Sequence, residues 1–199
     1  IQNIYGTSGM APLMIIGTVP LYNAFAVIVL SLLKPGQRKM DKALLQKTLK
    51  GIVTNPIILG IAAGFVWAIL KIPQPEILQK TVKNMAVLAT PLGLMAMGAS
   101  FEGKKALGKL KPTLIASALK LVVLAAIFLP MAVRLGYRES ELVAILVMLG
   151  SATTVSSFVM ARNMGHEGVL TSSIVMVTTL CSAFTLTGWL FLLKTLGLV

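Results

Sequence analysis

The stretch Gly150-Ser-Ala-Thr-Thr-Val-Ser-Ser157 interrupts an apolar run, residues 142–161, that is long enough to cross a bilayer. Five of its eight residues carry hydroxyl groups. Lipid forms no hydrogen bonds with exposed backbone or hydroxyl groups, so this stretch must face protein or a water-filled cavity. Many secondary transporters bind their substrates at interrupted helices near the membrane midplane. The stretch therefore favours a carrier over a simple helical bundle.

The composition of the chain is that of an α-helical membrane protein. Of 199 residues, 56% are hydrophobic and 12% are charged, and the mean hydropathy is +0.88. Most apolar residues fall in blocks of about 20, which is enough for a helix to cross ~30 Å of hydrocarbon. We predict an all-α integral membrane protein with six transmembrane helices. These are expected at residues 10–33, 52–70, 82–99, 112–133, 142–161 and 170–193.

The net charge of +12 reflects membrane topology, because the basic residues flank the apolar segments. Nucleic acid is therefore not an expected partner; the lipid bilayer is. Loops on one side hold eleven of the 18 Lys and Arg residues: Lys34, Arg38, Lys39, Lys42, Lys47, Lys50, Lys104, Lys105, Lys109, Lys111 and Arg162. That side should be cytoplasmic in the cell inner membrane, with both ends of the chain outside. Residues 34–50 can also form a basic interfacial helix.

The residues that usually carry catalysis or bind metals are scarce. Cys181 and His166 are the only residues of their types, and all six Asp and Glu residues lie in loops or at segment ends. We find no HExxH, GxSxG or P-loop motif. The sequence therefore predicts no enzyme, metal site or cofactor, and no proton relay built on acids within these segments.

Lys120 is the exception, because it lies about 12 Å into the segment that begins at Pro112. A lysine at that depth costs roughly 2.5–3.5 kcal/mol, so it should face the interior of the bundle. In the functional interpretation, its charge attracts an anionic substrate or alternates with a coupling cation. In the structural interpretation, it binds backbone carbonyls at a broken helix. The absence of an acid at depth slightly favours the anion.

Residues 150–157 also have two interpretations. If the helix unwinds there, the start of its second half presents a positive dipole to an anion. If it continues, its small residues form a face for close packing. The candidate substrate-binding residues are Lys120, Asn23, Ser151, Thr153, Thr154, Ser156 and Ser157.

Other polar positions within the segments carry weaker signals. Asn23 is either a contact between helices or a ligand contact, and Pro91 is expected to kink its segment. Asn55-Pro56 is interpreted as a helix start. In the last segment Thr171, Thr178, Ser182 and Thr185 share a helical face, which we interpret as packing.

Four short motifs occur along the chain in a fixed order. They are Thr54-Asn-Pro-Ile-Ile-Leu-Gly60, Ala89-Thr-Pro-Leu-Gly-Leu-Met-Ala-Met-Gly98, Leu119-Lys-Leu121 and Ser156-Ser-Phe-Val-Met-Ala-Arg-Asn-Met-Gly165. With this order and spacing, the chain resembles the bacterial auxin efflux carrier family, above all its malate-permease-like members, from about Tyr5 to the end.

The resemblance implies part of a ten-helix fold with two inverted five-helix repeats, like that of the bile acid sodium symporters. Residues 1–33 would hold the last helix of the first repeat and residues 34–50 a basic cytoplasmic loop. Residues 51–199 would form the second repeat, with scaffold helices in 51–99 and a transport core in 112–199. Its crossover helix would be 142–161, where many relatives have a proline and this chain has Ala152-Thr153-Thr154.

We therefore expect a secondary transporter that moves a small organic anion, either a dicarboxylate such as malate or an auxin-like acid, by alternating access. The coupling ion, proton or sodium, stays open, and a homodimer is possible. Because the chain starts at Ile1, helices of the same protein are expected to precede it. The alternative is a channel-like, structural or sensor membrane subunit without coupled transport.

Overall fold

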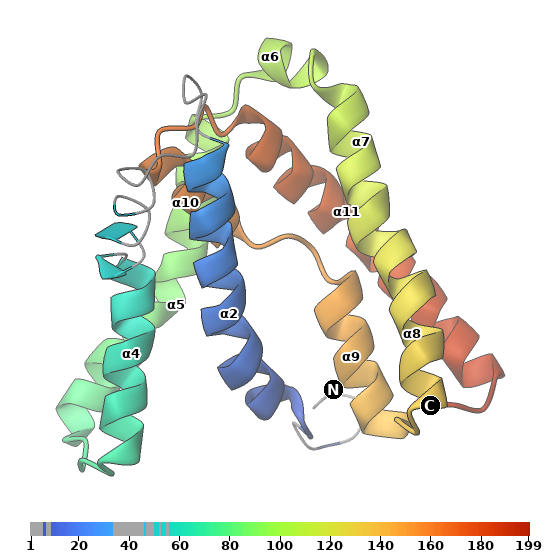
Figure 1. Ribbon diagram of the computed structural model, residues 1–199, viewed down its shortest axis with the longest axis horizontal. Coiled ribbons are helices and arrows are strands. Elements are labelled where there is room, and N and C mark those ends of the chain that lie inside the picture. Colours follow the sequence, from blue (N-terminus) through green and yellow to red (C-terminus); the bar gives the residue numbers. More distant parts are fainter. Residues whose placement is uncertain (1–5, 7–8, 34–45, 47–49, 52, 55) are drawn as a thin grey trace.

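The computed structural model describes residues 6, 9–33, 46, 50–51, 53–54 and 56–199 (Figure 1). The elements are α2 (Ala11–Leu32), α4 (Pro56–Ile69), α5 (Glu76–Ala99), α6 (Gly103–Leu107), α7 (Leu110–Ala118), the π-helical turn η1 (Leu119–Val123), α8 (Leu124–Arg134), α9 (Glu139–Gly150), α10 (Val155–Asn163) and α11 (Val169–Thr195). No strand occurs in these residues, so the all-α prediction is confirmed. The predicted interfacial helix at 34–50 lies outside them, apart from residues 46 and 50.

Within the described residues, five helical segments rather than six are long and apolar enough to cross a membrane. They are Ala11–Leu30, Glu76–Ala99, Leu110–Arg134, Glu139–Asn163 and Val169–Thr195. The remaining predicted segment, 52–70, contains α4, which has 14 residues where a full crossing needs about 20. Each of the other five predicted segments coincides with one of these spans.

The starts of α4 and α5 are explained by proline residues and by a charged first turn. α4 begins at Pro56, as predicted, since proline fixes a helical φ and needs no hydrogen-bond partner in the first turn. α5 begins at Glu76, earlier than the predicted residue 82, directly after Pro75. Glu76 favours the positive end of the helix and forms an ion pair with Lys80 at 2.6 Å. These polar turns extend the helix beyond its apolar part. Pro91 lies inside the continuous α5.

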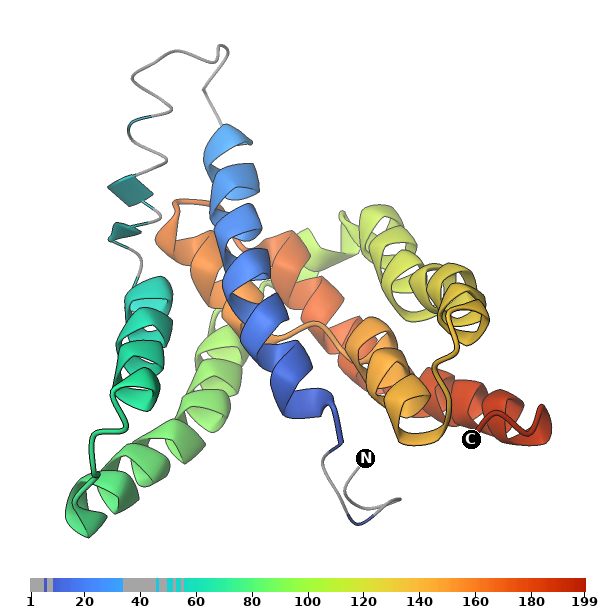
Figure 2. The same ribbon diagram turned by 60° about the horizontal axis from the view of Figure 1, so that its bottom comes forward.

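The helices form two groups joined by α10. Figures 1 and 2 show α4 and α5 on one side of the molecule and α7, α8, α9 and α11 on the other. In the second group, a core centred on Leu142 and Leu146 of α9 packs against α8 and α11. Phe158 of α10 packs against Met97 of α5 and Val175 of α11, which ties the two groups together. Large apolar side chains elsewhere are exposed, as expected for surfaces that face lipid.

Gly168 sets the sharp turn between α10 and α11. Its φ is +75°, and a Cβ built there would lie 2.7 Å from Arg162 Cδ and 2.9 Å from Phe158 Cε2. A side chain is therefore disfavoured both by the left-handed backbone and by the space available. Gly197 has a similar φ of +66° with no atom within 4 Å of such a Cβ, so it isolates the backbone effect.

We expect Gly168→Ala to lower the free energy of unfolding by roughly 2–4 kcal/mol, from left-handed strain and overpacking. Gly197→Ala should cost only about 1–2 kcal/mol, from strain alone. Thermal unfolding of both variants in detergent measures the difference. Equal losses would mean that the close packing around Gly168 is absent.

Candidate functional site

The span that contains the polar stretch is broken in two. α9 ends at Gly150, residues 151–154 are extended, and α10 begins at Val155. Ser151 and Thr154 have ψ values of 160° and 147°, far from the helical range. The unwinding interpretation is thus confirmed over the continuous-helix one. The break is shorter than the polar stretch, since Ser156 and Ser157 lie in the first turn of α10.

Lys120 donates a hydrogen bond to a backbone carbonyl at the end of α9 that the break leaves without its helical partner. Ser151 N still bonds to Val147 O, but the carbonyl of Met148 has lost its partner in the next turn. Lys120 Nζ donates to this oxygen at 3.3 Å. The negative end of the α9 dipole also favours the nearby cation. This contact is the one that the structural interpretation of Lys120 predicted.

The π-helical turn η1 carries Lys120 and was not predicted. Leu124 N bonds to Leu119 O, one residue further than in an α-helix. The turn contacts both α9 and α11. Trp189 of α11 donates its Nε1–H to Leu121 O at 3.2 Å, which supports a carbonyl within the irregular turn. Single π-turns inside membrane helices often mark functional sites.

Thr178 of α11 anchors the extended segment. Its side chain is fully buried, and its Oγ1 accepts a hydrogen bond from Thr153 N at 3.1 Å. The same hydroxyl can donate to Ile174 O at 2.7 Å within its own helix. One threonine therefore satisfies a backbone donor that the break leaves free. Our interpretation of Thr178 as simple packing missed this bond.

Hydroxyl groups gather where α10 begins. Thr154 Oγ1 and Ser156 Oγ lie 2.8 Å apart, and Ser157 Oγ donates to Thr154 O at 2.7 Å. Tyr22 of α2 brings its hydroxyl to 3.4 Å from Ser156 Oγ. No side chain caps the helix at Thr154, so the positive end of α10 stays uncompensated by a cap.

Asn23 is buried beside Tyr22, with 1% of its surface exposed. Its Nδ2 donates to Val19 O of its own helix at 2.7 Å. Its Oδ1 has no partner among the residues that the structure describes. An unpaired buried oxygen of this kind can accept a bond from a ligand or another helix. Its role in substrate binding stays a prediction.

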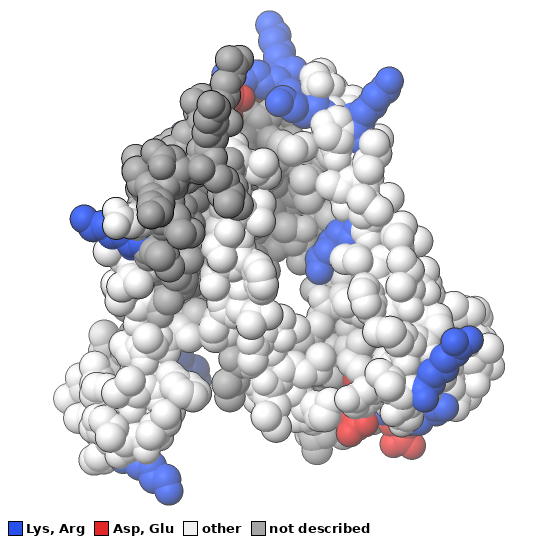
Figure 3. Space-filling model, viewed as in Figure 1, with Lys and Arg blue, Asp and Glu red and all other residues white. Residues whose placement is uncertain are grey.

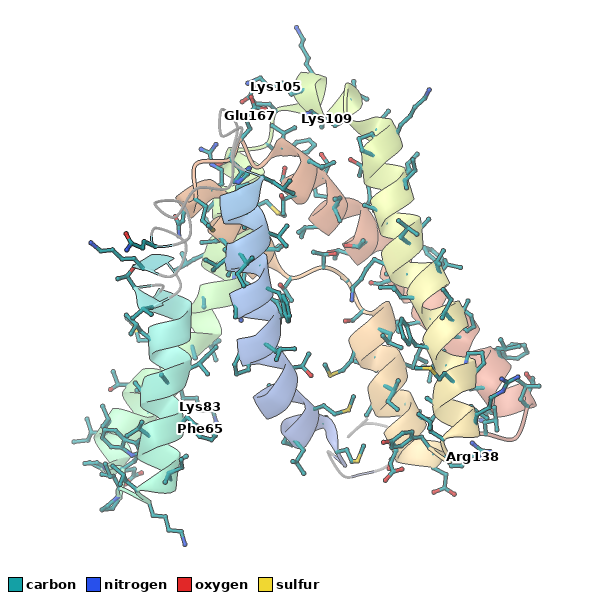
Figure 4. The ribbon with its side chains drawn as sticks, viewed as in Figure 1. Phe65, Lys83, Lys105, Lys109, Arg138 and Glu167 are labelled. Atoms are coloured by element: carbon teal, nitrogen blue, oxygen red, sulfur yellow. The ribbon has the colours of Figure 1, made fainter. Side chains whose placement is uncertain are left out.

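The residues missed from sequence are those whose role depends on contacts between distant helices. Tyr22, Thr178 and Trp189 each meet a segment far away in sequence. The stripe that contains Thr178 was visible, but the pattern could not show which hydroxyl faces the break. Figure 4 shows how the segment between α9 and α10 crosses the middle of the molecule.

The chain matches, over residues 8–190, the family model described as a membrane transport protein. It belongs to the auxin efflux carrier family. The resemblance noted from the four motifs is thereby confirmed. Neither the curated proteins nor the solved structures contain a match to it.

Members of this family are membrane transporters, so transport is the general function of the chain. The multi-pass membrane location follows from the family and the apolar helices together. No cluster of three or more His, Cys, Asp or Glu that could hold a metal ion is found in the described part of this carrier. The polar groups at the break are instead hydroxyls, backbone amides and one ammonium group.

We expect Thr178→Val to destabilise the broken span by about 1–3 kcal/mol, because Thr153 N–H then stays buried without a partner. Amide hydrogen exchange at Thr153 should accelerate. Thr178→Ser should preserve protection, since it keeps the hydroxyl. Thr185→Val is the matched control, because among the described residues Thr185 Oγ1 bonds to its own helix α11 alone. Unchanged exchange at Thr153 in Thr178→Val would contradict the anchoring role.

Proposed function

We propose that the protein is a secondary transporter that moves a small organic anion across the cell inner membrane by alternating access. The class of substrate is a dicarboxylate such as malate or an auxin-like acid. The observation that carries the proposal is the charge balance at the broken span. Lys120 offsets the negative end of α9, while the positive end of α10 has no compensating acid or side-chain cap in the described residues.

The electrostatics of this arrangement favour an anion. Each helix terminus carries about half an elementary charge, so the two ends at the break nearly cancel each other. Lys120 adds a full positive charge. The described acids all lie in loops or within the first turns of helices, away from the break. The surroundings of the break are therefore net positive and suit a carboxylate.

Lys120 is free enough to exchange its partner. Its bond to Met148 O is 3.3 Å long, whereas a charge-assisted N–H to oxygen bond is usually about 2.7–2.9 Å. Its side chain is only half-buried. Figure 3 shows that the molecule is hollowed between α2 and α8–α9, with basic atoms on the wall. A substrate carboxylate can therefore replace the Met148 carbonyl as the partner of Lys120, because only a weak hydrogen bond is lost.

The hydroxyl groups at the break supply specificity. Ser151, Thr153 and Thr154 belong to the extended segment, and Ser156 and Ser157 lie in the first turn of α10. Asn23 contributes an oxygen that can accept a hydrogen bond. A site rich in hydroxyls discriminates among acids by whether their own polar groups find partners.

We propose the remaining architecture, with the family resemblance as its support. Residues 51–99 act as scaffold and 112–199 as the moving core, within a ten-helix inverted repeat. Both ends of this chain lie outside the cytoplasm, and the coupling ion is a proton or sodium. A homodimer and preceding helices of the same protein complete the assembly.

Lys120→Ala should abolish counterflow of labelled malate or auxin-like acid in proteoliposomes, because the cation at the break is lost. Lys194→Ala, at the end of α11, is the control and should transport normally. Thermal unfolding of both variants separates loss of function from loss of fold. Normal counterflow by Lys120→Ala would remove Lys120 from the mechanism.

The same assay separates a carrier from a channel. A carrier gives flux that saturates with substrate and is stimulated by counter-anion inside the vesicle. Flux that rises linearly and ignores the counter-anion would instead support a channel-like subunit, and binding without flux a sensor.

A further inference from the structure

A second cavity lies away from the broken span, beneath the short helix α6. Its volume is about 400 Å³, within the range of small-molecule sites. Its apolar walls come from Phe101, Ala106, Leu107, Leu110, Met176 and Val177. The cavity is therefore framed by α6, α7 and α11, and nothing in the transport mechanism uses it.

The two polar side chains that line the cavity already have hydrogen-bond partners. Thr113 and Ser173 also line it, but both hydroxyls are satisfied by their own helices. Thr113 Oγ1 donates to Lys109 O at 2.8 Å, and Ser173 Oγ donates to Val169 O at 2.8 Å. Because no buried donor or acceptor there lacks a partner in the described structure, an apolar occupant fits best.

Basic residues are the sequence neighbours of the residues that line this cavity, within the segment 103–111. Lys104, Lys105, Lys109 and Lys111 all lie in or beside α6, and Figure 3 shows Lys and Arg gathered at this end of the molecule. Figure 4 labels Lys105, Lys109 and Glu167 there. Glu102 pairs with Lys105 at 2.9 Å. That hydrogen bond and the carboxylate charge raise the pKa of Lys105.

Lys104, Lys109 and Lys111 form no ion pair with the residues that the structure describes, and all three are exposed. Apolar walls and exposed lysines thus occur together on the short segment 103–111. The cavity also lies where α5 ends and α7 and α11 begin, at the ends of three membrane spans. In a bilayer, lipid headgroups lie near the ends of membrane-spanning helices.

We propose that this cavity binds one acyl chain of an anionic phospholipid, whose phosphate lies among the lysines around α6. An acyl chain matches the apolar walls, and the phosphate matches the charge of the lysines on residues 103–111. Long lysine side chains can reach the phosphate while their methylene stems cover apolar surface. The proposal depends on membrane insertion and not on which substrate is transported.

The test is native mass spectrometry of the purified protein with phosphatidylglycerol, phosphatidylcholine of the same acyl chains, and glycerol 3-phosphate. Phosphatidylglycerol should bind at least about tenfold more tightly than phosphatidylcholine. Lys104→Gln with Lys109→Gln should weaken its binding roughly 25-fold, at about fivefold for each lysine. The matched control, Lys80→Gln with Lys194→Gln, should leave binding unchanged.

Val177→Trp fills the cavity and should also abolish selective phosphatidylglycerol binding, while Val87→Trp on the exposed face of α5 should not. If Val177→Trp does not fold, Leu107→Asn replaces it, since Leu107 is 66% exposed. If the cavity variant still binds phosphatidylglycerol selectively, surface charge alone explains the binding and the proposal is wrong. Equal binding of phosphatidylcholine, or glycerol 3-phosphate binding as tightly as phosphatidylglycerol, would overturn it too.

Discussion

A helix that breaks inside a membrane must find new partners for its exposed backbone groups, because lipid provides none. In this protein Lys120 supplies the donor for Met148 O at the end of α9, and Thr178 accepts from Thr153 N in the extended segment. Neighbouring elements hold Lys120 in place. η1 carries Lys120 to α9, and Trp189 supports that turn through Leu121 O.

The two halves of the broken span are held by different neighbours. α9 packs through Leu142 and Leu146 into the core with α8 and α11, whereas Phe158 of α10 meets α5 and α11. Gly93 lets α5 approach the start of α10 closely, since a Cβ there would lie 2.9 Å from Val155 Cγ1. The break therefore lies where two packed groups meet, the place at which relative motion would change access to a site.

Much of the fold was predictable, because apolar length and proline positions govern membrane helices strongly. Five of the six segments and the start at Pro56 follow from local sequence, whereas the break after Gly150 was one of two interpretations that the sequence left open. The length of α5 was underestimated because Glu76 and Lys80 stabilise turns that hydropathy ignores.

The candidate site was only partly predictable. Lys120 and the hydroxyl stretch stand out by composition alone. The π-turn and the contacts of Thr178, Trp189 and Tyr22 depend on helices separated by 25 residues or more, so no local pattern reveals them. Asn23 was noticed in sequence, but only burial shows that its Oδ1 lacks a partner in the described structure.

The central claim is that residues 151–154 are unwound and face water inside the membrane. Cysteine accessibility tests it most directly, in a background where Cys181 is replaced by alanine. Thr153→Cys should react with a small hydrophilic thiol reagent in proteoliposomes, and bound organic anion should slow the reaction. Phe184 of α11 is 81% exposed, and we assign its side chain to lipid. Phe184→Cys should therefore react little. If Thr153→Cys is as inert as Phe184→Cys, the account of the broken span as a water-accessible site is wrong.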